Sequence, residues 1–335
     1  MTAPTPVCPL HLEGFPPELV FLKRDERSCH LYGGNKPRKL EFAIGAALAR
    51  GSKRLVTTGA LGTHHGLATT ILGAAVGLRT TLVLVHQPVT QEVRESLRLD
   101  VAHGAELLYA GSLPGAVAQT LRALARSSWR GERPTLIPTG GSSRHGNLGF
   151  VSAGLELAAQ VRTGELPEPR EIFLPIGSGG SAAGLVLGLR LAGLRTTLFG
   201  VVVTDLLAPN PRSLARSARA TLRLLQRQCR AFPNPQIGPE DFQLIHDQLG
   251  RGYGYTTAAA QEALALAAER GIHLEITYGA KCLAALRARL DRPGAPDGPI
   301  LFWNTYNAID LDLPRDGRDA TALPPPLQKI LDRSS

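Results

Sequence analysis

Three cations stand close together where a helix is predicted to begin. Lys36, Arg38 and Lys39 follow the pair Gly33-Gly34 and flank Pro37. Proline suits the first helical position, where its missing N–H needs no partner, and the residues that follow carry apolar side chains at helical spacing. A helix N-terminus disfavours cations. A solvated basic turn is the simpler interpretation, and a lysine kept there for a chemical task is the alternative.

A glycine-rich run, Gly-Ser-Gly-Gly-Ser-Ala at 177–182, follows a predicted apolar strand and opens a helix. Glycines in such a turn let backbone N–H groups close on an anion. The run lacks the Gly-Lys-Ser/Thr of a P-loop, and it fits a dinucleotide fingerprint only loosely, with Asp205 as the acidic residue. The hydroxyls of Ser178 and Ser181 suit a single phosphate monoester. A tight strand–helix turn without a ligand is the alternative.

A third run, Gly59–Gly66, also joins a strand to a helix and contains Thr63, His64 and His65. Adjacent histidines on a helix diverge and no ligand follows at i+4, so we expect no metal site. Two histidines that cap a helix are the simpler interpretation.

The elements that position these runs alternate along the chain. Such alternation predicts an α/β fold with mostly parallel sheets. Strands are expected at 54–58, 80–85, 106–109, 134–139, 171–176 and 197–203, and helices at 63–76, 91–104, 114–129, 147–161 and 182–192. Farther along, helices are expected at 213–230 and 257–270, a strand at 300–303, and a loose end at 324–335.

Composition is that of a globular protein. The 335 residues allow two domains, and no apolar run approaches the ~20 residues of a membrane span. The first ten residues show no secretory pattern. The four cysteines are scattered, which favours a reduced, cytoplasmic setting.

The net charge of +9 allows an anionic partner, including nucleic acid bound through the Arg-rich helix at 212–230. The alternative is the arginine usage of a GC-rich genome. We favour the latter, because aromatic residues make up only 5% and no nucleic-acid module is visible. We therefore expect neither a nucleic-acid nor a membrane partner.

The segment Gly33–Phe42, Gly-Gly-Asn-Lys-Pro-Arg-Lys-Leu-Glu-Phe, resembles the lysine segment of the pyridoxal-phosphate (PLP) enzymes grouped as 1-aminocyclopropane-1-carboxylate (ACC) deaminase and D-cysteine desulfhydrase. The resemblance runs in order to Asn307 and implies the tryptophan-synthase-β-like fold, with two three-layer domains. It implies that Lys36 carries PLP covalently. The cofactor-binding residues that it implies are Asn35, Lys36, His64, Gly177, Ser178, Gly179, Gly180, Ser181 and Thr305.

The resemblance also suggests catalytic residues. Thr63 matches a serine that handles protons, and Tyr253 and Tyr278 match two tyrosines near the cofactor. His64 stands where the family has an asparagine that contacts the PLP ring. Lys36, released as a base, is expected to have its pKa lowered by desolvation and by the charges of Arg38 and Lys39.

Departures from the family pattern gather around the ring. Gly279 stands where the family has glutamate or threonine against the pyridine nitrogen, and Tyr306-Asn307 replace two glycines. Tyr306 and Asn304 are candidates for the missing contact. These departures keep open a protein whose lyase activity is altered or lost and that serves as a binding or regulatory protein, or catalyses another PLP reaction.

The function that the resemblance implies is a PLP-dependent lyase that releases a 2-oxo acid and ammonia from a small amino acid such as D-cysteine or ACC. It implies a homodimer. The large PLP-binding domain is expected to comprise 1–49 and 151–335, with a small domain inserted at 50–150.

Overall fold

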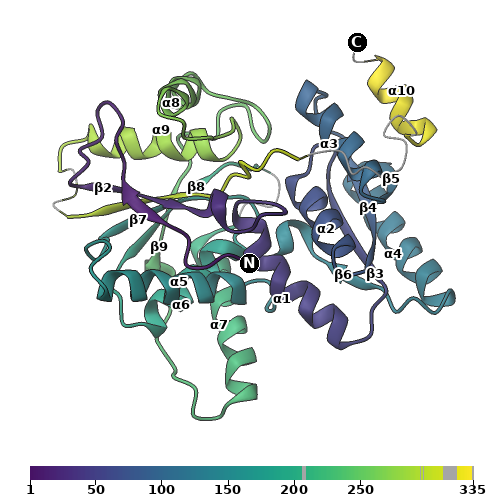
Figure 1. Ribbon diagram of the computed structural model, residues 1–335, viewed down its shortest axis with the longest axis horizontal. Coiled ribbons are helices and arrows are strands. Elements are labelled where there is room, and N and C mark those ends of the chain that lie inside the picture. Colours follow the sequence, from purple (N-terminus) through teal and green to yellow (C-terminus); the bar gives the residue numbers. More distant parts are fainter. Residues whose placement is uncertain (206–208, 295, 297, 312–322, 334–335) are drawn as a thin grey trace. The chain divides into compact units, whose positions relative to one another are not determined.

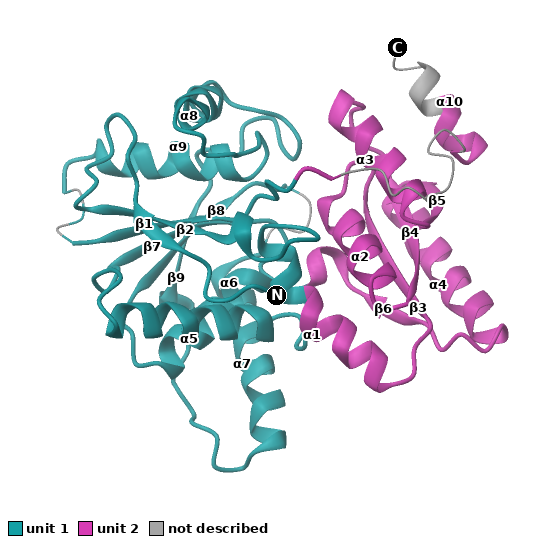
Figure 2. Ribbon diagram, in the orientation of Figure 1, with its two compact units in different colours: residues 1–39, 142–309 teal, residues 40–141, 310–335 magenta. Residues whose placement is uncertain are grey.

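The structure is a computed structural model that describes residues 1–205, 209–294, 296, 298–311 and 323–333. The chain forms two compact units (Figure 2). Unit 1 comprises residues 1–39 and 142–309, and unit 2 comprises 40–141 and 310–335. The division into a large PLP-binding domain (1–49 and 151–335) and a small inserted domain (50–150) stays a prediction.

The described part of unit 1 contains a six-stranded sheet in the order β1-β2-β10-β7-β8-β9. Figure 1 labels β2, β7, β8 and β9 of this sheet. All neighbours are parallel except β1, which is antiparallel to β2. The strands are β1 Val7–Pro9, β2 Val20–Arg24, β7 Glu171–Ile176, β8 Thr197–Val202, β9 Phe242–Ile245 and β10 Ile300–Asn304.

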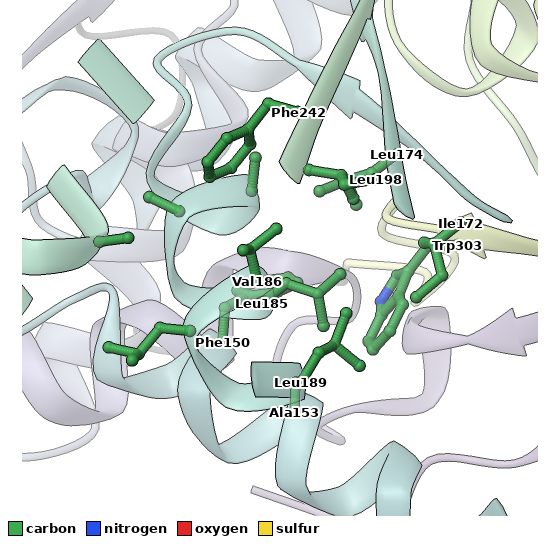
Figure 3. Close-up of a cluster of buried hydrophobic side chains, with 14 of the residues drawn as sticks. Phe150, Ala153, Ile172, Leu174, Leu185, Val186, Leu189, Leu198, Phe242 and Trp303 are labelled. Carbon is green, nitrogen blue, oxygen red and sulfur yellow. The ribbon is translucent and has the colours of Figure 1, made fainter. Parts of the chain in front are cut away.

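Helices cover both faces of this sheet. Successive side chains of a strand point to opposite faces, so the apolar strands have side chains to bury on each face. In β7, Ile172 and Leu174 join one core (Figure 3) and Phe173 joins the other. The first core packs against α5 Leu148–Arg162, α6 Gly180–Leu191 and α7 Pro211–Gln228, and the second against α8 Ala258–Glu269 and α9 Gly279–Leu290. Unit 1 is thus a three-layer α/β/α unit.

Unit 2 has a parallel sheet in the order β5-β4-β3-β6. Its strands are β3 Arg54–Ala60, β4 Arg79–Val85, β5 Glu106–Gly111 and β6 Thr135–Ile137. One face packs against α2 His64–Ala74 and α3 Gln91–Ala102, and the other carries α4 Leu113–Trp129. Helix α1, Asn35–Ala49, begins in unit 1 and continues into unit 2.

The predicted α/β class with mostly parallel sheets is confirmed. The prediction of a loose C-terminal end is wrong over α10, Pro325–Arg333, where Leu327 is buried in the core of unit 2; residues 334–335 lie outside the described part. The pattern also left β1, β9 and α9 unassigned. Short 3-10 turns occur at Asp25–Arg27, Thr139–Gly141 and Pro239–Asp241.

The Arg-rich helix is α7, and it is a surface helix as predicted. Leu214, Ala218 and Leu222 are buried, whereas the arginines at 212, 216, 219, 223 and 227 are exposed. Within the described residues, no helix is both long and apolar enough to cross a membrane.

Candidate functional site

The glycine-rich run forms the turn between β7 and α6, at the carboxyl end of β7. Gly179 caps α6 with φ +81°, a conformation that favours glycine. A Cβ on Gly177 would lie 3.2 Å from Tyr278 Oη, and a Cβ on Gly180 would lie 2.8 Å from Lys39 Nζ. Side chains would fill this space, so glycine leaves the N-terminus of α6 open to an anion.

Hydroxyl groups and a lysine complete this turn. Lys39 Nζ donates to Ser142 Oγ at 2.9 Å, and Gly180 N donates to the same oxygen at 3.1 Å. The hydroxyls of Ser142 and Ser178 are 2.7 Å apart. We call Lys39, Ser142, Ser178 and Gly180 the anion cradle. Ser181 lies in the first turn of α6 and is buried.

Lys39 is the cation of the cradle, and it is only 2% exposed. Burial and the charge of nearby Lys36 hold the pKa of Lys39 well below its usual range. Among the described residues, no carboxylate forms a salt bridge with Lys39. A buried ammonium without an anionic partner is costly, so the cradle fits a ligand with a phosphate group.

Lys36 lies one turn earlier on α1 and is half-buried. Its Nζ donates to Asn35 Oδ1 at 2.7 Å and lies 5.8 Å from the centroid of the Tyr278 ring. Burial lowers the pKa of Lys36 to about 8, and the charge of Glu275 opposes this shift. Lys36 can therefore accept and return a proton near neutral pH.

Arg38 has a different role from the one expected. Its guanidinium donates to Asp25 at 2.9 and 2.8 Å and to Glu156 at 2.9 Å. Burial by itself raises the pKa of Glu156. The hydrogen bonds and charges of Arg38 and Lys23 outweigh burial and lower this pKa to about 2. The expectation that Arg38 lowers the pKa of Lys36 is wrong, because these carboxylates neutralise it. Arg38 instead anchors the first turn of α1.

Tyr278 lies beside Lys36, and Tyr253 lies beside Tyr278. Tyr278 Oη donates to Tyr253 Oη at 3.3 Å, and the rings meet edge to face with centroids 5.9 Å apart. Burial raises the pKa of both tyrosines, most strongly that of Tyr278. Lys281 holds the loop that carries Tyr253 through its bond to Leu249 O at 2.8 Å. Both phenols are therefore protonated donors at neutral pH.

A carboxylate that sequence reasoning missed lies at the start of α9. Glu275 accepts hydrogen bonds from the backbone N–H groups of residues 277, 278 and 279 at 2.7–2.8 Å. We call Tyr253, Tyr278 and Glu275 the tyrosine wall. The signal in the sequence is a glutamate three residues before the tyrosine of the Thr-Tyr-Gly motif.

The segment after β10 packs against the glycine pair that precedes α1. Gly33 N donates to Asn307 Oδ1 at 2.6 Å, and Asn35 N donates to Thr305 O at 3.2 Å. Thr305 is buried. Asn304, a candidate for a ring contact, is fully buried and donates to Glu26 and to a backbone carbonyl. These contacts bring the segment to the start of α1.

Thr63 and His64 lie at the N-terminus of α2 in unit 2. Thr63 Oγ1 accepts a hydrogen bond from Gly66 N at 3.2 Å and so caps the helix. His65 Nε2 is 3.0 Å from Thr57 Oγ1. The described residues contain no cluster of three or more metal-ligating side chains. The roles of Thr63 and His64 toward the cofactor stay predictions.

Known proteins match this chain over most of its length. Residues 1–305 match the family described as pyridoxal-phosphate dependent enzyme. The chain is 33% identical to nocardicin C-9' epimerase of Nocardia uniformis over 91% of this chain and 90% of that protein. It is 33% identical to D-cysteine desulfhydrase of Salmonella paratyphi A, over 91% and 92%.

This chain belongs to the family of pyridoxal-phosphate dependent enzymes.

Within that family, the crystal structure of an ACC deaminase homologue superposes with a TM-score of 0.76 at 27% identity, over 92% of this chain and 90% of the other. The resemblance to the ACC deaminase and D-cysteine desulfhydrase group is confirmed, and so is the cofactor, PLP. The cradle fits it, because no carboxylate of the described residues pairs with Lys39 and the glycines leave room for a phosphate.

Proposed function

We propose that this protein is a PLP-dependent lyase that acts on a small amino acid of the D-cysteine or ACC type and releases a 2-oxo acid and ammonia. The observation that carries the proposal is Lys36, whose pKa of about 8 suits proton transfer and whose Nζ faces the Tyr278 ring. Relatives named D-cysteine desulfhydrase, 33% identical, support the substrate class.

Each group of residues has a separate task. Lys39, the serine hydroxyls and the backbone N–H groups of 177–181 bind the phosphate. PLP, when bound, supplies the capacity to withdraw electrons from the substrate Cα. Lys36 removes or returns a proton at Cα or Cβ, and Tyr278, paired with Tyr253, donates a proton. The proposed roles of Thr63 in proton handling and of His64 toward the ring rest on the family resemblance alone.

With D-cysteine, the Cβ–S bond breaks and sulfide leaves. The three-carbon remainder takes up water and gives pyruvate and ammonia. With ACC, a ring C–C bond opens, the freed carbon takes up a proton, and addition of water gives 2-oxobutanoate and ammonia. The proposal includes a homodimer, which the resemblance implies, and a cytoplasmic setting, which the scattered cysteines favour.

The test is release of product from the purified, PLP-loaded enzyme. Pyruvate and sulfide from D-cysteine, or 2-oxobutanoate from ACC, support the proposal when Lys36→Ala abolishes them. An unaltered rate in Lys36→Ala would exclude Lys36 as the base.

A second candidate is epimerisation at Cα, favoured by the nocardicin C-9' epimerase relative. In that case D-amino acids would exchange Cα–H for deuterium and invert without any 2-oxo acid. If the protein binds PLP but neither exchanges the Cα proton of an amino acid nor releases a 2-oxo acid, a binding or regulatory role is favoured instead. The observation that suggests this role is Gly279, which replaces the family's glutamate or threonine.

A further inference from the structure

Glu275 is held where the chain turns into α9. Its Oε1 accepts from Tyr278 N at 2.7 Å and Gly279 N at 2.8 Å, and its Oε2 accepts from Thr277 N at 2.7 Å. Its backbone carbonyl accepts from Ala280 N at 3.0 Å. Such carboxylate–amide bonds are short and strong. One residue therefore fixes the backbone of the whole turn that carries Tyr278.

The turn depends on this carboxylate, because Tyr278 is the N-cap residue of α9 and its own side chain makes no capping hydrogen bond. Its phenol instead reaches Tyr253 Oη, and its ring faces Lys36. Gly279 has no side chain, and a Cβ there would meet Leu274 Cδ2 at 3.1 Å. Glu275 thus brings a carboxylate to a turn where Gly279 cannot.

The negative charge of Glu275 acts on its neighbours. It favours the protonated forms of Lys36 from α1, Lys281 from α9, and Tyr253 and Tyr278. Burial raises the pKa of Glu275 itself, while the three backbone hydrogen bonds and the charge of Lys36 oppose that shift.

We propose that Glu275 is a positioning residue that fixes Tyr278 beside Lys36 and supplies a negative charge that acts on the Lys36 ammonium. Glu275 does not itself touch the reacting atoms. The catalytic consequence rests on the proposed function, whereas the contacts of Glu275 with the turn that carries Tyr278 do not.

The test compares Glu275→Gln, which removes the charge, with Glu275→Asp, which keeps the charge on a shorter side chain. The chain has six lysines, so the side-chain ¹⁵N signals of labelled apo-protein can be assigned with Lys36→Ala. We expect Glu275→Gln to titrate Lys36 at a lower pH than the wild type. Glu275→Asp is expected to keep that midpoint but to shift the ring signals of Tyr278. Ser112→Ala, which removes a cap of α4 in unit 2, is expected to change neither.

In the loaded enzyme, both variants are expected to lose about 100-fold in kcat, the scale of a ~1 Å misplacement near reacting atoms, with a smaller change in KM. An unchanged Lys36 midpoint in folded Glu275→Gln would overturn the charge role. If Glu275→Gln does not fold, Glu275→Asp tests the proposal. Ring signals of Tyr278 that do not shift in Glu275→Asp would overturn the positioning role. Because the titration uses apo-protein, an enzyme without lyase activity would refute the proposed function and leave this test intact.

Discussion

The anion cradle and the tyrosine wall both lie in unit 1 but differ in construction. The cradle is made of the Gly180 N–H, two hydroxyls and a buried lysine. Ser178 and Gly180 lie in the turn between β7 and α6, whereas Lys39 lies on α1. The wall is made of side chains from the loop at Tyr253 and the turn before α9. The cradle suits binding of a fixed charge, whereas the wall suits movement of protons. Changes in the cradle should therefore alter affinity for PLP, and changes in the wall should alter turnover.

Lys36 belongs to both functions, so its loss should have the largest effect. Lys36→Ala is expected to lower kcat by about 10⁴-fold, the upper end for one acid–base group. Borohydride should no longer attach PLP covalently to the chain, and mass spectrometry of the reduced protein measures this. If PLP is still attached to the variant after reduction, another lysine carries the cofactor.

Lys39 tests the cradle alone. Lys39→Met is expected to cost about 1.5–3 kcal/mol of PLP binding, or roughly 10- to 150-fold in Kd, because a charge-assisted hydrogen bond to phosphate is lost. Titration calorimetry of apo-protein with PLP measures this. The exposed Lys53 gives the control Lys53→Met, and equal Kd values for both variants would contradict an anion cradle at Lys39.

Tyr278 tests the wall. Tyr278→Phe removes the phenol that bonds to Tyr253, and kcat is expected to fall by about 10²-fold while the Kd for PLP stays unchanged. Steady-state kinetics and calorimetry separate the two. Tyr255, which stacks on Arg251, supplies the control Tyr255→Phe. A weaker Kd with normal kcat would reverse the assignment.

Gly177 lies where the two regions meet. A Cβ there would be 3.2 Å from Tyr278 Oη, so Gly177→Ala is expected to change both Kd and kcat by a few fold. Gly45→Ala is the matched control, because nothing lies within 4 Å of its Cβ; it should stabilise α1 by about 0.5–1 kcal/mol. A change in only one of the two constants would show that the regions are independent.

The last effect concerns the pH dependence of stability. Lys36 has a pKa of about 8 in the folded protein and about 10.4 when unfolded. Between these values the unfolded state binds a proton that the folded state does not, so stability rises with pH. The stability of apo wild type minus that of Lys36→Met, from urea titrations, should therefore increase between about pH 8 and 10.4. A flat difference would mean that Lys36 is solvated.

Much of the fold and half of the candidate site were predictable from sequence, because the signals are local. The glycine run and the Gly-Gly-Asn-Lys segment each specify a turn and a helix start within a few residues. The partners of Arg38 were not predictable, since Glu156 lies 118 residues away. The role of Glu275 was missed for another reason: its partners are backbone groups, so only its position three residues before Tyr278 points to it.

Strand β10 has a consequence for biosynthesis. It lies between β2 and β7, yet it is the last strand of its sheet to be made. A nascent chain emerges N-terminus first, so β2 and the lysines of α1 leave the ribosome long before the strand that joins them to β7. The sheet of unit 1 closes only after Asn304 is synthesised. The contacts that the segment after β10 makes with the start of α1 therefore form late, after all of the cradle residues have been synthesised.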